Sequence, residues 1–349
     1  MRAFVTGSTG LLGNNLVRAL LVAGHEVVAL VRSRSKAQRQ FGDLEVEIVE
    51  GDILQPERFV AALKGCDAFF HTAAFFREYY QPGDHQETLR VTNIDATIAL
   101  LNAAEAAGVQ QTIYVSSSGV IGMQPDGRPG DETTGPDKRS LENLYFRSKV
   151  EAEDAVFAWI KTHQMPVVLI LPGWMFGPGD AAPTGAGGFL LDHLNRRLPG
   201  KLRGSIDIVD ARDVATAMVN AVEHGRPGER YIIGGTQTTI AALHDTIAQV
   251  SGVPAPAINL PTGLVTVLAH LSDAIASTTR QRSAIPLAGI RTLTANKSVS
   301  SAKAARELGA RFRPLRATIH DTIAWYLEQQ PEKVVQAPQI VARMRSAVA

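Results

Sequence analysis

The sequence predicts a doubly wound α/β fold, in which a mostly parallel sheet is covered by helices on both faces. Short apolar runs alternate with longer segments that are apolar at helical spacing. The connections are short, and glycine follows several helical segments, as at Gly24 and Gly108. The first strand-to-helix turn carries Gly7, Gly10 and Gly13. These observations indicate consecutive strand–helix–strand units.

The expected elements alternate through the first half of the chain. A first strand ends at Thr6, and further strands are expected over 27–31, 46–49, 67–73, 112–116 and 167–171. Helices are expected over 11–23, from Pro56, over 88–107 and over 145–163. A further strand over 206–210 and a helix over 211–223 are expected to return to this sheet.

The glycine turn suits a dinucleotide. Gly7 lets the chain turn off the strand, Gly10 lets backbone approach a ligand, and Gly13 lets the helix pack close to the sheet. The free N–H groups at the start of the helix then face a pyrophosphate. An ordinary strand-to-helix turn would look similar, but the complete strand–helix–strand unit favours the dinucleotide.

The end of the second strand favours NADP over NAD. A dinucleotide site normally places a carboxylate there on the adenosine ribose, but this chain has Arg32-Ser33-Arg34. A guanidinium can hold a 2′-phosphate by charge-assisted hydrogen bonds, whereas a carboxylate would repel it. NAD stays possible, because arginines in a solvated loop would look the same.

The composition indicates a small-molecule partner. The formal net charge is +1 with no basic block, so nothing points to nucleic acid or to an anionic membrane surface. The single cysteine, Cys66, fits a reducing compartment, and we expect a soluble cytoplasmic protein. The apolar segment 264–275 is too short to span a bilayer. No His or carboxylate pair stands at metal-ligand spacing.

The candidate chemistry lies after the fifth strand. That strand ends in three serines, Ser116 to Ser118, and the next helix opens with Tyr145-x-x-x-Lys149. Residues four apart share a helix face, so the Lys149 ammonium can favour the Tyr145 phenolate and bring it into acid–base range. A serine hydroxyl can hold the substrate oxygen.

Aromatic residues follow the fourth strand. The stretch from Phe75 to Tyr80 lies just beyond the carboxyl end of that strand, where open α/β sheets bind ligands. Packing of these rings over the sheet edge is an equally good explanation. The tentative substrate contacts are Phe75, Arg77, Tyr79, Ser118 and Trp174.

With these motifs in place, the chain resembles an extended short-chain dehydrogenase/reductase of the NAD-dependent epimerase/dehydratase family, over nearly its whole length. The matching motifs are Thr6-Gly7-x-x-Gly10-x-x-Gly13, His71-x-Ala73-Ala74, Asn93, Ser116-Ser117-Ser118, Tyr145-x-x-x-Lys149, Pro172-Gly173-x-x-Phe176-Gly177-Pro178-Gly179, Arg212-Asp213-Val214-Ala215, Tyr231-x-x-Gly234-Gly235 and Glu307-Leu308-Gly309. Overall it is similar to the dihydroflavonol-reductase-like and hopanoid-associated group.

The resemblance implies a Rossmann fold and roles for particular residues. Tyr145 would be the catalytic acid–base, Lys149 would bind the nicotinamide ribose, and Ser117 would be the catalytic serine by its distance from Gly122. Asp52 and Ile53 would contact the adenine. The implied cofactor contacts are Gly7, Thr9, Gly10, Leu11, Leu12, Gly13, Arg32, Asp52, Ile53, Thr72, Ala73, Ala74, Asn93, Tyr145, Lys149 and Pro172.

Three functions stay open. The first is reduction of a carbonyl on a moderately apolar molecule, favoured because the stretch 172–176 lacks the asparagine with which sugar-nucleotide epimerases usually reach a diphosphate. The second is a sugar-nucleotide epimerase or dehydratase with tightly bound NAD. The third is a redox sensor that binds dinucleotide without chemistry, against which the Ser, Tyr and Lys set argues.

The expected organisation has two parts and a tail. Residues 1–171, with the returns near 206–233, form the dinucleotide-binding part, and 172–205 with 234–330 form the substrate-binding region. Within that region 178–188 is a candidate lid, and 240–252 and 264–277 cap the pocket. The apolar face of 264–277 is expected to be core rather than a substrate or membrane surface. Residues 331–349 form the tail, and the resemblance suggests a homodimer through helices 88–107 and 145–163.

Overall fold

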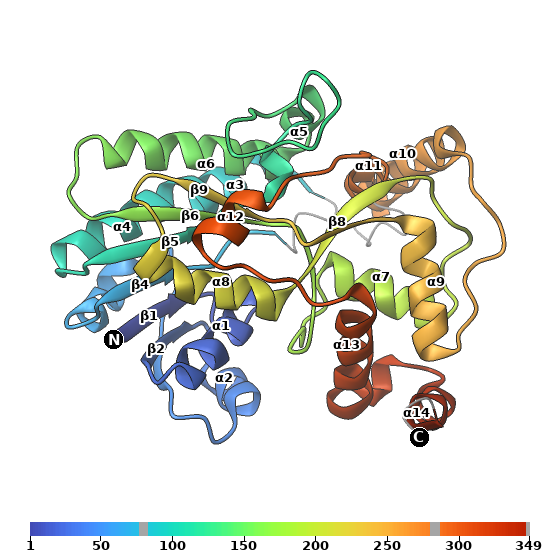
Figure 1. Cartoon of the computed structure of the whole chain (residues 1–349), viewed down its shortest axis with the longest axis horizontal. Coiled ribbons are helices and arrows are strands. Elements are labelled where there is room, and N and C mark those ends of the chain that lie inside the picture. The colour runs from blue at the N-terminus through green and yellow to red at the C-terminus, as the bar shows by residue number, and fades with distance from the viewer. Residues whose placement is uncertain (77–82, 280–286, 347–349) are drawn as a thin grey trace.

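The computed structural model describes residues 1–76, 83–279 and 287–346, and its centre is a seven-stranded parallel sheet (Figure 1). The strand order is β3-β2-β1-β4-β5-β6-β9. The strands are β1 (Arg2–Thr6), β2 (Glu26–Val31), β3 (Glu47–Glu50), β4 (Ala68–His71), β5 (Gln111–Val115), β6 (Val167–Pro172) and β9 (Arg230–Ile233). The predicted doubly wound α/β fold is confirmed.

Helices cover both faces of this sheet. One face packs on α1 (Leu11–Val22), α2 (Arg34–Phe41) and α8 (Ala211–His224). The other packs on α4 (Ala96–Ala106) and α6 (Leu144–Ile160), with α5 (Lys138–Glu142) just before α6. Each strand therefore buries side chains on both faces of the sheet. This explains why its sequence is a continuous apolar run and does not alternate between apolar and polar residues.

Two expected helices differ in detail. The helix expected over 88–107 begins earlier, as α3 (Gln86–Leu89), and continues through a π-helical segment (Arg90–Asp95) into α4. The helix expected from Pro56 is only two 3-10 turns, Pro56–Arg58 and Val60–Leu63. These turns still bury Phe59 and Leu63 against the sheet. They therefore cover the sheet where a helix was expected, although they contain fewer residues than a helix.

The region expected to bind substrate lies beyond one end of the central sheet and is built on a second, three-stranded sheet of order β10-β8-β7 (Figure 1). Its strands are β7 (Trp174–Phe176), β8 (Ser205–Asp210) and β10 (Thr236–Thr239). Its helices are α7 (Gly185–Leu194), α9 (Ile240–Ser251), α10 (Thr262–Thr279), α11 (Leu287–Leu293), α13 (Leu315–Gln329) and α14 (Ala337–Ser346), while α12 (Ala302–Glu307) packs by β9.

The expected return of strand 206–210 to the central sheet is therefore wrong. That strand is β8, and it pairs with β7 and β10, while β9 takes the edge of the central sheet beside β6. The helix that follows β8 does return, because α8 packs along α1. The chain thus crosses into the central part at the start of α8 and leaves it again between β9 and β10.

The segment 178–188 is anchored rather than lid-like. Asp180 is buried and accepts hydrogen bonds from the Thr184 backbone N–H and hydroxyl, and Thr184 caps α7. Gly185 to Gly188 form the first turn of that helix. Small residues are used here because Gly187 packs directly against Asp180 and Tyr326.

The last residues are part of the substrate-binding region rather than a separate tail. Val334, Ile340 and Met344 are buried in the same core cluster as side chains of α9 and α13. None of the helices in the described parts of the chain is long and apolar enough to cross a membrane.

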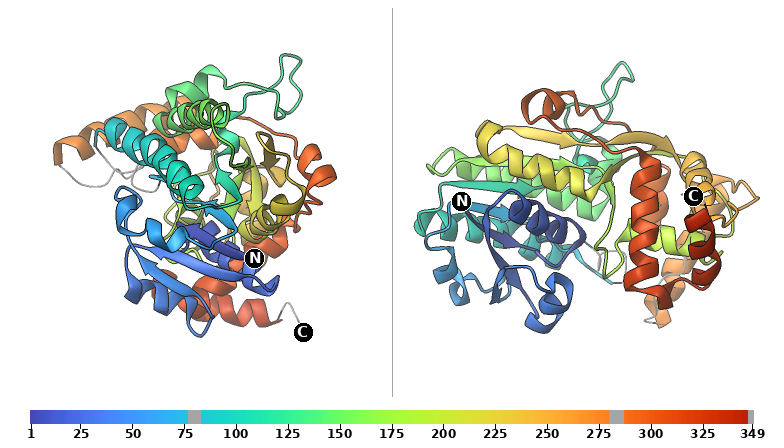
Figure 2. Two further views of the ribbon diagram at one scale, coloured as in Figure 1. Left: turned by 90° about the vertical axis from the view of Figure 1, so that its left-hand side faces the viewer. Right: turned by 60° about the horizontal axis from the view of Figure 1, so that its bottom comes forward.

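The apolar face of α10 is not core, contrary to the expectation. Its buried residues are the small Val265, Ala269 and Ala276, whereas its larger aliphatic side chains point outward. In the left view of Figure 2 this orange helix forms the outer edge of the molecule.

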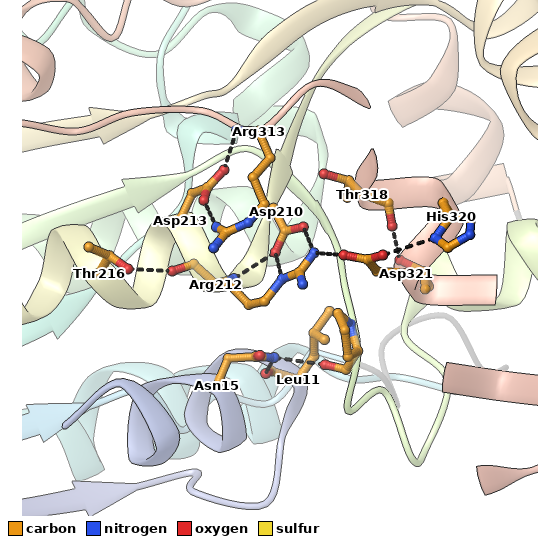
Figure 3. Close-up of polar contacts among 12 residues, drawn as sticks. Leu11, Asn15, Asp210, Arg212, Asp213, Thr216, Arg313, Thr318, His320 and Asp321 are labelled. Atoms are coloured by element: carbon orange, nitrogen blue, oxygen red, sulfur yellow. Dashed lines mark hydrogen bonds and ion pairs between the residues drawn. The ribbon is translucent and has the colours of Figure 1, made fainter. Parts of the chain in front are cut away.

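A chain of charges ties the two parts together (Figure 3). The Arg212 guanidinium donates to both oxygens of Asp210, at 2.9 and 2.7 Å, and lies 2.8 Å from an oxygen of Asp321 on α13. The Asp210 side chain is completely buried. A second pair joins Asp213 of α8 to Arg313. These contacts fix α13 against the start of α8.

We expect Arg212→Met to destabilise the protein by about 3–5 kcal/mol, because the buried Asp210 carboxylate loses its counter-charge. The double variant Arg212→Met/Asp210→Asn should recover part of this loss. The free energy of unfolding in urea is the measurement, with the exposed Thr216→Ala on the same helix as control. A loss below about 1 kcal/mol for Arg212→Met would contradict the role given to this pair.

Candidate functional site

The glycine turn between β1 and α1 is closely packed. Gly7 has φ of +67°, and a Cβ there would lie 2.7 Å from the backbone nitrogen of Ala73. A Cβ on Gly13 would collide with the Gly7 carbonyl oxygen. Ser8 adds a hydrogen bond of 2.9 Å from its hydroxyl to the Leu30 carbonyl. Glycine is therefore required at Gly7 by conformation and at Gly13 by close approach.

The start of α1 fits a phosphate group. Its N-cap residue, Gly10, supplies no side-chain hydrogen bond to the first turn, and Gly10 to Gly13 line a cavity of about 510 Å³. Helix N–H groups without an internal partner and the positive end of the helix dipole thus face open space. This arrangement can hold a dinucleotide pyrophosphate.

The two arginines after β2 have different surroundings. Arg32 is exposed and lines the cavity. Arg34 instead donates from its guanidinium to the Ile48 carbonyl on β3, at 2.7 Å. Of the two cations, only Arg32 is placed to meet a group held at the glycine turn.

The Tyr145 and Lys149 side chains come from the buried face of α6. Asn143 caps this helix by accepting hydrogen bonds from the backbone N–H groups of Tyr145 and Phe146, each at 3.1 Å. One turn on, the Lys149 ammonium donates to the Val115 carbonyl at the tip of β5, at 2.9 Å. Lys149 therefore fixes α6 against the strand that carries the serines.

Burial changes the charge balance around Lys149. Desolvation lowers the pKa of Lys149 from 10.5 to about 8, and nearby Glu153 partly opposes this shift. Glu153 is itself buried, which raises its pKa, and it lies 3.2 Å from the Arg230 guanidinium on β9. Its other oxygen, Oε1, has no hydrogen-bond partner. The ammonium is thus held in an almost dry environment, where its influence on neighbours is strong.

The serines after β5 have distinct positions. The Ser117 hydroxyl accepts a hydrogen bond from the Gly119 backbone N–H, at 3.1 Å, and caps a 3-10 turn (Ser118–Val120). Ser117 and Ser118 both line the cavity. Ser116 also reaches the cavity wall, but its hydroxyl oxygen is buried without a partner.

A single cavity of about 510 Å³ brings most of the expected site residues together. It runs from the glycine turn past the tips of β5 and β6 to the substrate-binding region. The expected residues that line it are Gly7, Gly10, Leu11, Leu12, Gly13, Arg32, Thr72, Ala74, Ser117, Ser118, Tyr145, Lys149, Pro172 and Trp174.

Other expected site residues do not line this cavity. Among the described residues these are Thr9, Asp52, Ile53, Ala73, Phe75 and Asn93. Asn93 is buried and accepts from the Phe75 N–H at 2.7 Å, so it braces the loop after β4. The Phe75 ring packs on His85, with centroids 5.5 Å apart, instead of facing the cavity. Arg77 and Tyr79 lie outside the described residues.

The cavity also contains residues that were not expected as site residues. Phe76 lines it, with its ring centroid 4.8 Å from that of Tyr145, and Met175 lies beside Trp174. Phe76 is next to the expected Phe75, and only the path of the loop decides which ring turns inward. Arg139, Arg291 and Lys297 line the far wall, where the Lys297 ammonium pairs with Asp137 at 2.8 Å.

His71, at the end of β4, is buried and has a structural role. His71 contacts the Thr6 hydroxyl at 2.8 Å and the Thr97 hydroxyl at 3.0 Å. Burial, followed by the charge of Lys149, lowers the pKa of His71 to about 3. The neutral imidazole therefore links β4 to β1 and α4 over the whole physiological pH range.

Comparisons with known proteins agree with this fold. Residues 3–234 match the model of the NAD dependent epimerase/dehydratase family. Sterol demethylase protein B of Methylococcus capsulatus is 32% identical over 94% of this chain and 99% of its own. A provisionally named dihydroflavonol 4-reductase of Synechocystis sp. is 29% identical over 93% and 94% of the two chains. A nucleoside-diphosphate-sugar epimerase structure from Pseudomonas aeruginosa is 25% identical over 95% and 98%, with a TM-score of 0.77.

We expect Lys149→Met to stabilise the ligand-free protein at pH 7 by about 1–2 kcal/mol. The buried ammonium has a folded pKa of about 8 against 10.5, so its unfavourable contribution is fully present below pH 8 and fades as pH rises toward 10.5. The gain in free energy of unfolding for Lys149→Met should therefore be smaller at pH 10 than at pH 7. Urea unfolding at both pH values measures it, with the exposed Lys161→Met as control; a less stable variant at pH 7 would contradict the argument.

Proposed function

The chain belongs to the NAD-dependent epimerase/dehydratase family, and on that premise we propose that it is an NADP-dependent oxidoreductase acting on a carbonyl, or the matching alcohol, of a moderately apolar small molecule. It is an enzyme of the extended short-chain dehydrogenase/reductase type. The observation that carries the proposal is that Ser117, Tyr145 and Lys149 line one cavity with the glycine turn.

The residues divide the chemistry between them. A bound nicotinamide supplies or accepts the hydride. The Tyr145 hydroxyl gives its proton to the alkoxide oxygen as the carbonyl is reduced, and takes it back in oxidation. Lys149 holds a positive charge close to that phenol and so favours the phenolate. The Ser117 hydroxyl donates to the carbonyl oxygen and orients it.

The cavity walls support a moderately apolar substrate. The Trp174, Phe76 and Met175 side chains line the cavity, and the Phe76 ring packs against the Tyr145 ring. Burying a diphosphate against such a wall without donors would be costly. Two relatives that match this chain over more than nine-tenths of their own length are named sterol demethylase protein B and, provisionally, dihydroflavonol 4-reductase, so both names refer to polycyclic small molecules rather than to nucleotide sugars.

The cofactor preference is proposed from Arg32. Its position after β2 and at the cavity wall allows its guanidinium to bind a 2′-phosphate. Asp52 and Ile53, at the end of neighbouring β3, stay candidates for the adenine, although neither lines the cavity.

A sugar-nucleotide epimerase or dehydratase is the second candidate. It is favoured by the Arg139 and Arg291 side chains on the far cavity wall and by the likeness to the Pseudomonas aeruginosa epimerase structure. The two functions differ in one measurement. An epimerase would retain NAD through purification and would show no net oxidation of added NADPH, whereas the proposed reductase consumes NADPH.

The proposed assembly is a homodimer through the helices before β5 and β6. Half-buried apolar side chains such as Ile98 on α4 and Phe157 on α6 lie on this face and would pair with a second copy. Size-exclusion chromatography with light scattering tests the assembly, and a monomer at micromolar concentration would contradict it.

We expect Tyr145→Phe to lower the rate of NADPH-dependent reduction by about 10²–10⁴-fold while leaving NADPH affinity nearly unchanged, because only the acid–base group is lost. The rate is measured by NADPH absorbance on a panel of aromatic and alicyclic ketones. Tyr114→Phe is the matched control, since it removes a nearby buried hydroxyl that has no partner. Full turnover by Tyr145→Phe would overturn the mechanism.

We expect Arg32→Gln to weaken NADP binding by about 10–100-fold and NAD binding by less than about threefold, because a charge-assisted contact to the 2′-phosphate is lost. Calorimetric titration of both cofactors measures this. Arg34→Gln is the control, because the Arg34 guanidinium already donates a hydrogen bond to the Ile48 carbonyl. Equal losses for the two cofactors would remove the NADP assignment.

A further inference from the structure

A second cavity lies between helix α6 and the edge strand β9. Its volume is about 280 Å³, and its charged lining residues are Glu153 and Asp154 of α6 and Arg230 of β9. None of the residues that line it borders the larger cavity of about 510 Å³. Asp154 is exposed, so the second cavity reaches the surface of the protein.

Glu153 has one carboxylate oxygen that is paired and one that is not. Its Oε2 lies 3.2 Å from the Arg230 guanidinium, whereas Oε1 is buried and makes no hydrogen bond to any residue that the structure describes. The whole side chain is only 5% exposed. A buried oxygen without a donor is rare in folded proteins, and a role in proton transfer is one reason for keeping it.

The Ser116 hydroxyl lies beside this carboxyl. Burial raises the pKa of Glu153, and the nearby Ser116 hydroxyl lowers it by hydrogen bonding. The contact falls short of a fully formed hydrogen bond, because the Ser116 oxygen is also buried without a partner among the described residues. Ser116 lines the larger cavity and Glu153 lines the second one. The two side chains therefore stand between the two cavities.

The surroundings of Glu153 allow its carboxyl to exist with or without a proton. Burial favours the neutral acid, while the Arg230 guanidinium and the Lys149 ammonium favour the carboxylate. Lys149 lies one helical turn before Glu153 and lines the larger cavity. A hydroxyl can accept one proton while it donates another, so Ser116 can connect this carboxyl to the larger cavity.

The proposed reduction consumes one proton in each turnover. The Tyr145 hydroxyl gives its proton to the alkoxide oxygen and must regain one before the next cycle. Tyr145 lines the larger cavity, which also contains the glycine turn, so a bound dinucleotide and substrate would occupy the space in front of the phenol. A proton that arrives from behind α6 would not have to pass them.

We propose that Glu153 and Ser116 form a route for protons between the second cavity and Tyr145, a role that rests on the proposed reductase function. The Glu153 carboxyl takes a proton from water in the second cavity and gives it to the Ser116 oxygen. The Ser116 hydroxyl releases its own proton into the larger cavity, where the Tyr145 phenolate is protonated again. Glu153 and Ser116 end as they began, and no electrons move. In alcohol oxidation the same steps run in reverse.

The rate at which the Tyr145 phenolate forms after a jump to higher pH tests this route without a substrate. The full chain is first saturated with NADP, or with NAD if NAD binds more tightly. The phenolate is followed by its ultraviolet absorbance, and Tyr145→Phe gives the signal of the other tyrosines. We expect Glu153→Gln to slow this step about tenfold or more, because a carboxamide does not carry the proton. Asp154→Asn is the matched control, since Asp154 lines the same cavity but is exposed.

Added formate separates proton transfer from a structural effect. It should restore the rate in Glu153→Ala, where a small acid can take the place of the lost carboxyl, and should not restore it in Glu153→Gln. Ser116→Ala is the second variant, and it should be slow with or without formate. Cofactor binding measured by calorimetry shows that each variant is folded.

Two results would overturn the proton route. One is an equal rate of phenolate formation in the wild type and in Glu153→Gln. The other is a slow Glu153→Ala variant that formate does not restore. Neither measurement uses a carbonyl substrate, so a failure to reduce any ketone would count against the proposed function and would leave this test of Glu153 and Ser116 in force.

Discussion

The buried contact between the Lys149 ammonium and the tip of β5 is the interaction on which the site depends. The 2.9 Å hydrogen bond to the Val115 carbonyl joins α6 to the strand that leads to Ser117. Because Tyr145 lies one turn earlier on the same helix face, this bond also sets where the phenol lies. A lysine in this position costs folding free energy, since burial lowers its pKa to about 8. The protein thus accepts a local cost in stability to keep this charge buried at the cavity wall.

The charges around that lysine form a layered arrangement behind the cavity. Glu153 follows Lys149 by one turn and is paired with Arg230 on β9, the last strand of the central sheet. The positive charge of Lys149 is therefore balanced by the Glu153 carboxylate, and Glu153 is balanced in turn by the Arg230 guanidinium on β9. Such a chain of partners lets ionised groups stay buried in a mostly apolar sandwich.

The substrate-binding region is fastened where it meets the cofactor region and is apolar where it faces outward. Arg212 and its two carboxylate partners hold α13 against the start of α8, and the Asn15 amide donates to the Pro178 carbonyl at 2.8 Å beside the glycine turn. On α10, by contrast, several aliphatic side chains are exposed. The contacts that order the second region relative to the cofactor region therefore lie at their shared boundary.

The sequence by itself determined the doubly wound sheet, the glycine turn and the residue types of the site. These follow from local rules: apolar runs form strands, glycine permits φ of +67° at Gly7, and Tyr145 and Lys149 share a helix face. Only the tertiary structure decided that β8 joins the second sheet, that Phe76 rather than Phe75 faces the cavity, and that α10 turns its large side chains outward. Periodicity identifies an apolar face of a helix, but what lies opposite that face depends on elements distant in the chain.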